Sequence, residues 1–245
     1  MHSNYRFLFL AVAVLWLQGC DSDSLPPVPM AEPPPPPLPT MAGFDVSVDN
    51  LTNAQPLSPI AVIGHLDGYA VFVIGDAATV GLEDMAEGGD NTALLAEADG
   101  NTNVLVSASG GAPIGPAGSE TVSIEVLESD VPNLRISVAT MLVNTNDAFS
   151  ALDAMDVSSL AVGDTILVEL VAYDAGTEAD TEAAGDIPGP AGGGEGFNMA
   201  RSDAADRVAM HAGVVSQDDG FATSDLTEQH RFDNPVMRVR IARTQ

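Results

Sequence analysis

Short runs of β-branched and apolar residues recur along this chain and constrain its fold more than any other feature. Most runs alternate apolar with polar residues or are fully apolar, and Gly, Pro, Asn or Asp bound them. The runs span residues 44–48, 60–64, 69–75, 104–109, 121–127, 134–143, 165–173, 207–213 and 236–243. Eight or nine such runs in one domain predict an all-β fold, a sandwich or a barrel.

The last run shows the two-faced pattern of a strand most clearly. Met237, Val239 and Ile241 fall on one face, whereas Arg238 and Arg240 fall on the other. A strand of this kind is expected to bury its apolar face and to leave its arginines towards solvent.

Two short helices and one long loop are expected between the strands. Asp76 can cap a helix over residues 77–87, and Asn91 can cap a second over residues 92–98. Residues 178–198 are rich in Gly, Ala, Pro and Glu and carry no core signal. They are therefore predicted to form a long flexible loop.

The start of the chain resembles a targeting signal rather than a part of the fold. An apolar run over residues 7–17, too short to span a bilayer comfortably, leads into LQGC, which ends at Cys20. This pattern resembles a bacterial lipobox and predicts a lipoprotein signal peptide over residues 1–19, with diacylglycerol on Cys20. An ordinary secretory signal with an incidental cysteine is the alternative. The lipid would be the protein's only contact with the membrane.

Residues 20–42 are predicted to be a tether between this anchor and the folded domain. Nine of the 17 prolines lie here, which favours extended polyproline II. The remaining residues, 43–245, fit one domain. Because Cys20 is the only cysteine, no disulfide can form within the domain, and its core alone must hold the fold.

The charge of the chain limits its partners. The sequence has no lysine, and its 8 basic residues face 35 acidic ones, a net charge of −27. Loss of Arg6 with the signal would leave seven arginines and a net charge of 7 − 35 = −28. So negative a surface repels nucleic acid and anionic lipid, and attracts divalent cations weakly and generally.

Two segments, NTNDAF (144–149) and YDAGTE (173–178), place carboxylates in turns directly after hydrophobic strands. Loops at one end of a sandwich can bring Asp147, Asp174 and Glu178 to one point. Calcium takes six to eight oxygen ligands and tolerates irregular geometry, so three flexible carboxylates suit it. The alternatives are that Asp147 caps the following turn and that Asp174 forms an Asx-turn.

These same segments resemble the spondin N-terminal domain family in its bacterial form. The resemblance rests on MLVNTNDAF, AYDAGTEADTE and the closing NPVMRVRIAR, and it runs from about Phe44 to Arg243. It implies an antiparallel β-sandwich of about eight strands, similar to calcium- and phospholipid-binding sandwiches. Animal members are extracellular matrix proteins. The family's calcium ligands correspond to Asp147, Asp174 and Glu178, the last of which is Asp in the animal pattern.

Other motifs for catalysis or metal binding are weak. His65, His211 and His230 form no H-E-x-x-H pattern and no pair at helical spacing, so each is expected to be structural or at the surface. No G-x-S-x-G elbow is present. The glycine-rich residues 189–196 lack the lysine of a phosphate loop, and the turn at Asp99 lacks the glycine and glutamate of an EF-hand.

The sequence thus predicts an exported bacterial lipoprotein of the cell envelope. Its function is expected to be calcium-dependent adhesion or recognition of an extracellular or envelope protein or glycan, without catalysis and without nucleic acid. An envelope hydrolase that uses His211 with a nearby acid is one alternative. A purely structural surface protein is the other.

Overall fold

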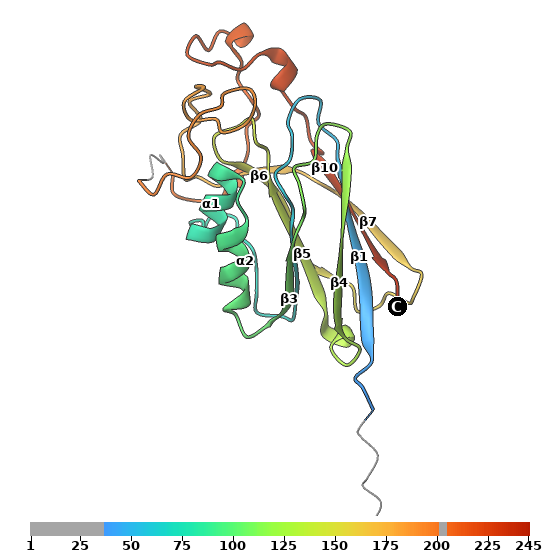
Figure 1. The fold of residues 1–245 in the computed structure, drawn as a ribbon. Coiled ribbons are helices and arrows are strands. Elements are labelled where there is room, and N and C mark those ends of the chain that lie inside the picture. Colours follow the sequence, from blue (N-terminus) through green and yellow to red (C-terminus); the bar gives the residue numbers. More distant parts are fainter. Residues whose placement is uncertain (1–36, 201–204) are drawn as a thin grey trace, which may run out of the picture. The chain divides into compact units, whose positions relative to one another are not determined.

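The computed structural model describes residues 37–200 and 205–245 (Figure 1). The strands are β1 (Met41–Asn50), β2 (Ala61–His65), β3 (Val104–Ser109), β4 (Ser119–Leu127), β5 (Arg135–Met141), β6 (Ala148–Asp156), β7 (Thr165–Leu170), β8 (Ala172–Asp174), β9 (Ala209–Met210) and β10 (Met237–Arg243). Helices α1 (Val80–Gly88) and α2 (Thr92–Asp99) lie between β2 and β3. Single 3₁₀ turns cover Val131–Asn133, Gln217–Asp219 and Glu228–His230. The predicted signal peptide, Cys20 and most of the predicted tether lie outside the described residues.

The strands of Pro39–Gln245 form two antiparallel sheets. One sheet has the order β4-β1-β10-β7, and the other has the order β3-β2-β5-β6-β8-β9. β1 and β10, the first and last strands of the domain, pair with each other. The centre of the four-stranded sheet is therefore formed by the two ends of the domain's sequence. The predicted all-β sandwich is confirmed.

Two cores explain which strands alternate and which are apolar throughout. Phe44, Val46 and Val48 of β1 point into a core between the sheets. The other face of the six-stranded sheet packs against α1 and α2 in a second core, to which Leu82 and Met85 contribute. β5 is buried on both faces from Ile136 to Met141, which accounts for the absence of a clear alternation of apolar and polar residues along it.

The predicted face of β10 is confirmed. Met237, Val239 and Ile241 are buried in the core between the sheets, while Arg238 and Arg240 are not. Arg238 instead forms an ion pair with Glu169 of β7 (2.7 Å).

The predicted strand over residues 69–75 is wrong, because these residues form a loop. Phe72 packs edge-on against Phe149 and also contacts Tyr173, whereas Val73 and Ile74 are exposed. Of the residues that produced the strand signal, Tyr69, Val71 and Phe72 thus pack onto the second core as single side chains. They do not pair with a neighbouring strand.

Two further predicted strands are altered by the tertiary structure. Only Ala209–Met210 of the run 207–213 pairs as a strand. The run 165–173 divides between the sheets: β7 joins the four-stranded sheet, and β8 joins the other one. The run contains no Gly, Pro, Asn or Asp between Leu170 and Ala172, so the sequence does not show where the chain leaves one sheet for the other.

β6 has no strand signal in the sequence, which at residues 148–155 favours no more than a turn that Asp147 could cap. Its first five residues are all buried, so its burial does not alternate. Ala148 and Leu152 face the core between the sheets, whereas Phe149 and Ala151 face the core under the helices.

Of the two helices, α1 has a side-chain N-cap and α2 does not. α1 starts after Thr79, whose hydroxyl accepts a hydrogen bond from the Leu82 amide (3.2 Å), and not at the predicted cap Asp76. Asn91 stands at the N-cap of α2 as predicted, but its side chain donates instead to the carbonyl of Pro59 (2.9 Å). No helix of the described residues is long and apolar enough to cross a membrane.

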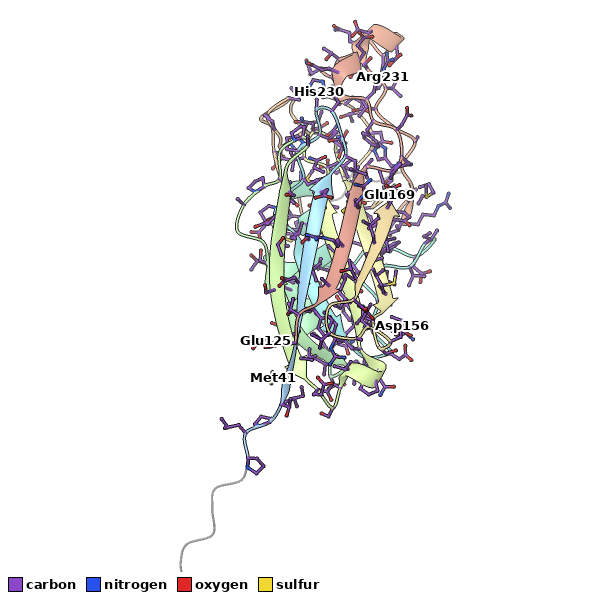
Figure 2. All side chains as sticks on the ribbon, turned by 90° about the vertical axis from the view of Figure 1, so that its right-hand side faces the viewer. Met41, Glu125, Asp156, Glu169, His230 and Arg231 are labelled. Atoms are coloured by element: carbon purple, nitrogen blue, oxygen red, sulfur yellow. The ribbon has the colours of Figure 1, made fainter. Side chains whose placement is uncertain are left out.

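The two ends of β1 mark the two ends of the sandwich. The chain enters the domain at Met41, and Figure 2 shows Met41 far from His230 at the opposite end. Gln55, shortly after Asn50 where β1 ends, donates its amide to the carbonyl of Asn144 (3.2 Å). The loop that carries the predicted ligand Asp147 therefore lies at the end opposite to the entry point.

Candidate metal centre

The loop between β5 and β6 is ordered by its own side chains. The hydroxyl of Thr145 donates to the carbonyl of Leu142 (2.6 Å) and accepts from the amide of Ala148 (3.0 Å). These bonds fold Asn144–Asp147 back onto the sheet, and Asp147 becomes fully buried. A carboxylate therefore sits in the protein interior at the point where β6 begins.

Asp174 reaches the same place from the neighbouring strand. It ends β8, where its backbone pairs with Ala148 on one side and Ala209 on the other. Its Oδ1 accepts a hydrogen bond from the Gly176 amide (2.7 Å), which is the predicted Asx-turn. The register of β6 and β8 thus places the carboxylates of Asp147 and Asp174 side by side.

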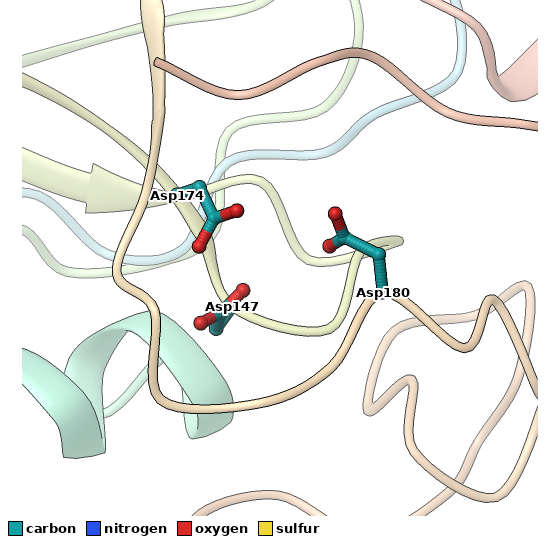
Figure 3. A group of neighbouring side chains, drawn as sticks. All are labelled: Asp147, Asp174 and Asp180. Atoms are coloured by element: carbon teal, nitrogen blue, oxygen red, sulfur yellow. The ribbon is translucent and has the colours of Figure 1, made fainter. Parts of the chain in front are cut away.

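A third carboxylate completes the group. Asp147, Asp174 and Asp180 each offer an oxygen, and these three oxygens lie within 4.8 Å of one another. Figure 3 shows the three carboxylates pointing towards a common centre from separate parts of the chain. Asp180 is not among the ligands predicted from the sequence. The only signal for it is its place in the acidic run that begins at Glu178.

The carboxylate of Glu178, the third predicted ligand, is not part of this group. Its backbone amide instead donates to Asp147 Oδ2 (3.1 Å), so the residue helps to hold Asp147 in place. Burial raises the pKa of the Glu178 carboxyl to about 8, together with repulsion from Glu87, Asp147 and Asp186. Its Oε2 is buried without a hydrogen-bond partner.

The two oxygens of Asp147 differ in their surroundings. Oδ2 accepts from the amide of Thr177 (2.8 Å), from the Thr177 hydroxyl (3.3 Å) and from the amide of Glu178. Oδ1 is buried and has no hydrogen-bond partner. Burial, and after it the charge of Asp174, raises the pKa of Asp147 to about 7 despite the amide donors. Burial and the charge of Asp180 likewise raise the pKa of Asp174.

A family model described as Spondin_N matches residues 51–185, more than half of the chain. The chain belongs to the spondin N-terminal domain family. This confirms the resemblance seen in the sequence, and all three grouped aspartates lie within the matched region. A search of curated proteins finds no match.

Membership of the spondin N-terminal domain family suggests an extracellular module of the adhesion type. The matched residues stop before β9 and β10, although β10 lies inside the four-stranded sheet and β9 pairs with Asp174. The last 60 residues therefore complete both the fold and the surroundings of the aspartate group, beyond the part that the family model recognises.

His211 comes from this last segment and lies beside the aspartates. Its Nε2 is 3.8 Å from Asp180 Oδ1. Its Nδ1 accepts a hydrogen bond from the Gly213 amide (2.9 Å), so the neutral ring carries its proton on Nε2, towards Asp180. Burial lowers the pKa of His211, although Asp180 and Asp174 oppose this shift. Among the described residues, His211 has no hydrogen bond to a Ser, Thr or Cys side chain that could serve as a nucleophile.

The other two histidines of the domain have structural partners. His65 is fully buried, with Nδ1 against the carbonyl of Leu66 (2.8 Å) and Nε2 against the hydroxyl of Ser137 (2.9 Å). His230 accepts a hydrogen bond from the amide of Thr227 (3.0 Å) and so caps its own 3₁₀ turn.

The grouped residues fit a hard divalent cation. They supply only oxygen, the donor that calcium prefers, and one of these oxygens is buried without a partner. Burial first, and then repulsion from the neighbouring aspartates, raises the pKa values of Asp147 and Asp174, so both factors oppose their ionised forms. A bound cation would favour those ionised forms.

Proposed function

We propose that this protein is an exported, membrane-anchored recognition module whose loops are organised by calcium. The observation that carries the proposal is the meeting of Asp147, Asp174 and Asp180, which each offer an oxygen within 4.8 Å of the others, together with the buried, unpartnered Oδ1 of Asp147. An isolated carboxylate in the interior is costly unless it is paired or binds a metal. Asp147, Asp174 and Asp180 would hold the cation, and the cation would fix the loop after β5 against the loop after β8.

The position of the site supports a role in binding partners. The aspartates lie at the end of the sandwich opposite to Met41, where the chain enters the domain. A protein held at its N-terminus by a lipid on Cys20 and a proline-rich tether would present this end away from the membrane. The partner would be an extracellular or envelope protein or glycan, and the net charge of −27 disfavours nucleic acid and anionic lipid.

A calcium titration tests the proposal. Binding to the folded state alone stabilises it by about 2.7 kcal/mol at a hundredfold excess over the dissociation constant. For a domain of this size, that corresponds to a rise in melting temperature of about 5–10 °C. Magnesium should produce a smaller rise, because it requires a tighter octahedral site.

Asp174→Asn should remove most of the rise, while the calcium-free protein stays as stable as before or becomes slightly more stable, since one repelling charge is gone. Glu195→Gln, at an exposed position of the long loop, is the matched control for charge and should respond to calcium like the parent. An equal response of the parent and Asp174→Asn would mean that calcium only screens the overall charge, and would refute the site.

We propose no catalytic role, and the hydrolase alternative can be separated from the binding role by one variant. Hydrolysis that depends on His211 would persist in the presence of a chelator and would be lost in His211→Gln. Capture of a partner that is lost with a chelator favours the recognition module. A purely structural surface protein would show neither effect.

A further inference from the structure

We propose that the aspartate group leaves its cation open towards a small pocket and that this pocket binds a carboxylate side chain of a partner protein, with Arg207 at its rim. The inference rests on the proposed calcium site and names the chemistry of the ligand that this site would take.

The three aspartates alone supply too few oxygens to surround calcium. Asp147 Oδ2 already accepts three hydrogen bonds, and Asp174 Oδ1 accepts the Gly176 amide. This leaves Asp147 Oδ1, Asp174 Oδ2 and the two oxygens of Asp180 as the freest carboxylate oxygens. Calcium takes about six to eight oxygens, so about two to four remain to be supplied by backbone carbonyls, water or a ligand.

A pocket opens beside these oxygens. It has a volume of about 220 Å³, and Asp174, Glu178 and Asp180 line it together with Arg207. The fully buried Asp147 is not among the lining residues, so the group presents two of its three aspartates to the pocket. Sites for whole small molecules are usually larger, about 300–1,000 Å³, so this pocket suits a group the size of one side chain.

The backbone of Arg207 is fixed at the rim. A Cβ atom on Gly176 would lie 2.3 Å from the Arg207 carbonyl oxygen, so the two segments are in close contact. The next residue, Val208, exchanges hydrogen bonds with Gly75 and Asp76, donating to one and accepting from the other (both 2.8 Å). The exposed Arg207 side chain therefore starts from a defined point beside the aspartates.

An anion is the ligand that both the bound cation and the Arg207 side chain would favour. A carboxylate can place one oxygen on a hard cation, and an arginine guanidinium binds a carboxylate through two parallel hydrogen bonds. The net charge of −27 repels extended polyanions. These two facts together select a single carboxylate on an otherwise neutral or basic surface, such as a Glu or Asp side chain of a partner protein.

The luminescence of europium(III), a substitute for calcium, tests the inference on the purified protein. Its decay in H₂O and in D₂O gives the number of bound water molecules. We expect about two or more waters.

The blocked tripeptide Gly-Glu-Gly should lower this number, whereas its Gly-Gln-Gly counterpart should not. Arg207→Gln should raise the concentration of the Glu peptide needed by several-fold, while its affinity for europium, measured separately, should not fall, because the variant removes a positive charge beside the cation. Arg207→Lys keeps the charge but loses the paired donors, so the concentration of the Glu peptide that it needs should lie between those of the parent and of Arg207→Gln.

Each failure has a distinct meaning. A europium ion without bound water, or equal effects of the Glu and Gln peptides, would overturn the open site while the cation site itself stands. An unchanged response of Arg207→Gln to the Glu peptide would overturn the role of Arg207. If europium binds Asp174→Asn as tightly as the parent, the proposed calcium site fails first.

Discussion

At Asp147, burial and charge oppose each other. The residue is fully buried, and its Oδ2 is held by the amides of Thr177 and Glu178, yet burial and Asp174 raise its pKa to about 7. Amide donors that favour the charged form therefore do not outweigh the loss of water. A cation at Oδ1 would remove this conflict, because it favours the ionised carboxylate directly.

The third ligand can be identified by comparing two neutral substitutions. If the grouping seen in the structure holds the cation, Asp180→Asn should abolish most of the calcium-induced rise in melting temperature, whereas Glu178→Gln should keep it. The reason is that the oxygens of Asp180 lie within 4.8 Å of those of the other aspartates, while the Glu178 carboxylate lies outside the group. The opposite ranking would restore Glu178 as the ligand and remove Asp180.

The raised pKa values predict how stability changes with pH in the absence of calcium. The pKa values of Asp147 and Glu178 are raised to about 7 and about 8 in the folded protein, above their unfolded values near 4. The folded state then binds more protons than the unfolded state. The stabilisation that these two groups contribute is therefore fully present below about pH 4 and is lost as the pH rises towards 8.

With chelator present, the melting temperature should accordingly fall between pH 5 and pH 8, by about 2–4 °C for each kcal/mol lost. The rise in melting temperature that calcium produces should become larger between pH 5 and pH 8, because the cation binds the ionised carboxylates. Asp147→Asn should flatten the fall measured in chelator. A melting temperature that rises with pH in chelator would contradict the assigned direction of these pKa shifts.

At the scale of elements, the crossing of one chain segment between the sheets builds the site. β7 ends at Leu170 in the four-stranded sheet, and β8 begins at Ala172 in the other one. The hydroxyl of Ser150 on β6 donates to the carbonyl of Val171 between them (2.9 Å). This crossing directs Asp174 towards the loop that carries Asp147, and the turn at Gly176 then brings the chain against Arg207.

Gly176 should therefore tolerate no side chain. It has φ +72°, and an added Cβ would meet the Arg207 carbonyl oxygen at 2.3 Å. Gly193 has the same φ of +72° but no neighbour within 4 Å, so Gly193→Ala should show only the cost of the left-handed conformation, about 1–2 kcal/mol. Gly176→Ala should cost more than this, and it should also weaken the calcium response. Urea unfolding of both variants measures the difference, and equal losses would show that the close approach to Arg207 is not needed.

At the scale of the whole molecule, the candidate site lies at the end of the domain opposite to the end where the chain enters it. β1 runs the length of the sandwich from Met41, and the loops that carry the aspartates lie beyond its far end. Figure 2 shows this separation between Met41 and His230. An anchor that precedes Met41 would therefore join the domain at the end opposite to the aspartates.

The proposed attachment depends on one atom, the sulfur of Cys20. Cys20→Ser should abolish incorporation of a labelled fatty acid and release the protein from the membrane fraction, because the serine hydroxyl cannot form the thioether. The folded domain should be unaffected, with the same melting temperature and the same response to calcium. Fatty-acid labelling that survives Cys20→Ser would end the lipoprotein proposal.

The sequence by itself determined the class of fold and two of the three grouped aspartates. Period-two runs such as β1 and β10 place their apolar residues on one face, and this pattern is local, so it can be read without the tertiary structure. Asp147 and Asp174 were predictable because each follows a hydrophobic strand and lies in a segment typical of the family.

The tertiary structure alone decided the features that depend on partners distant in the sequence. β6 and the loop 69–75 were misread because burial on two faces, and aromatic packing onto a neighbouring core, leave no periodic signal. Asp180 and Arg207 approach Asp174 only through the register of β8 with β9 and the tight turn at Gly176. Such placement depends on contacts between segments, which composition and spacing within one segment do not contain.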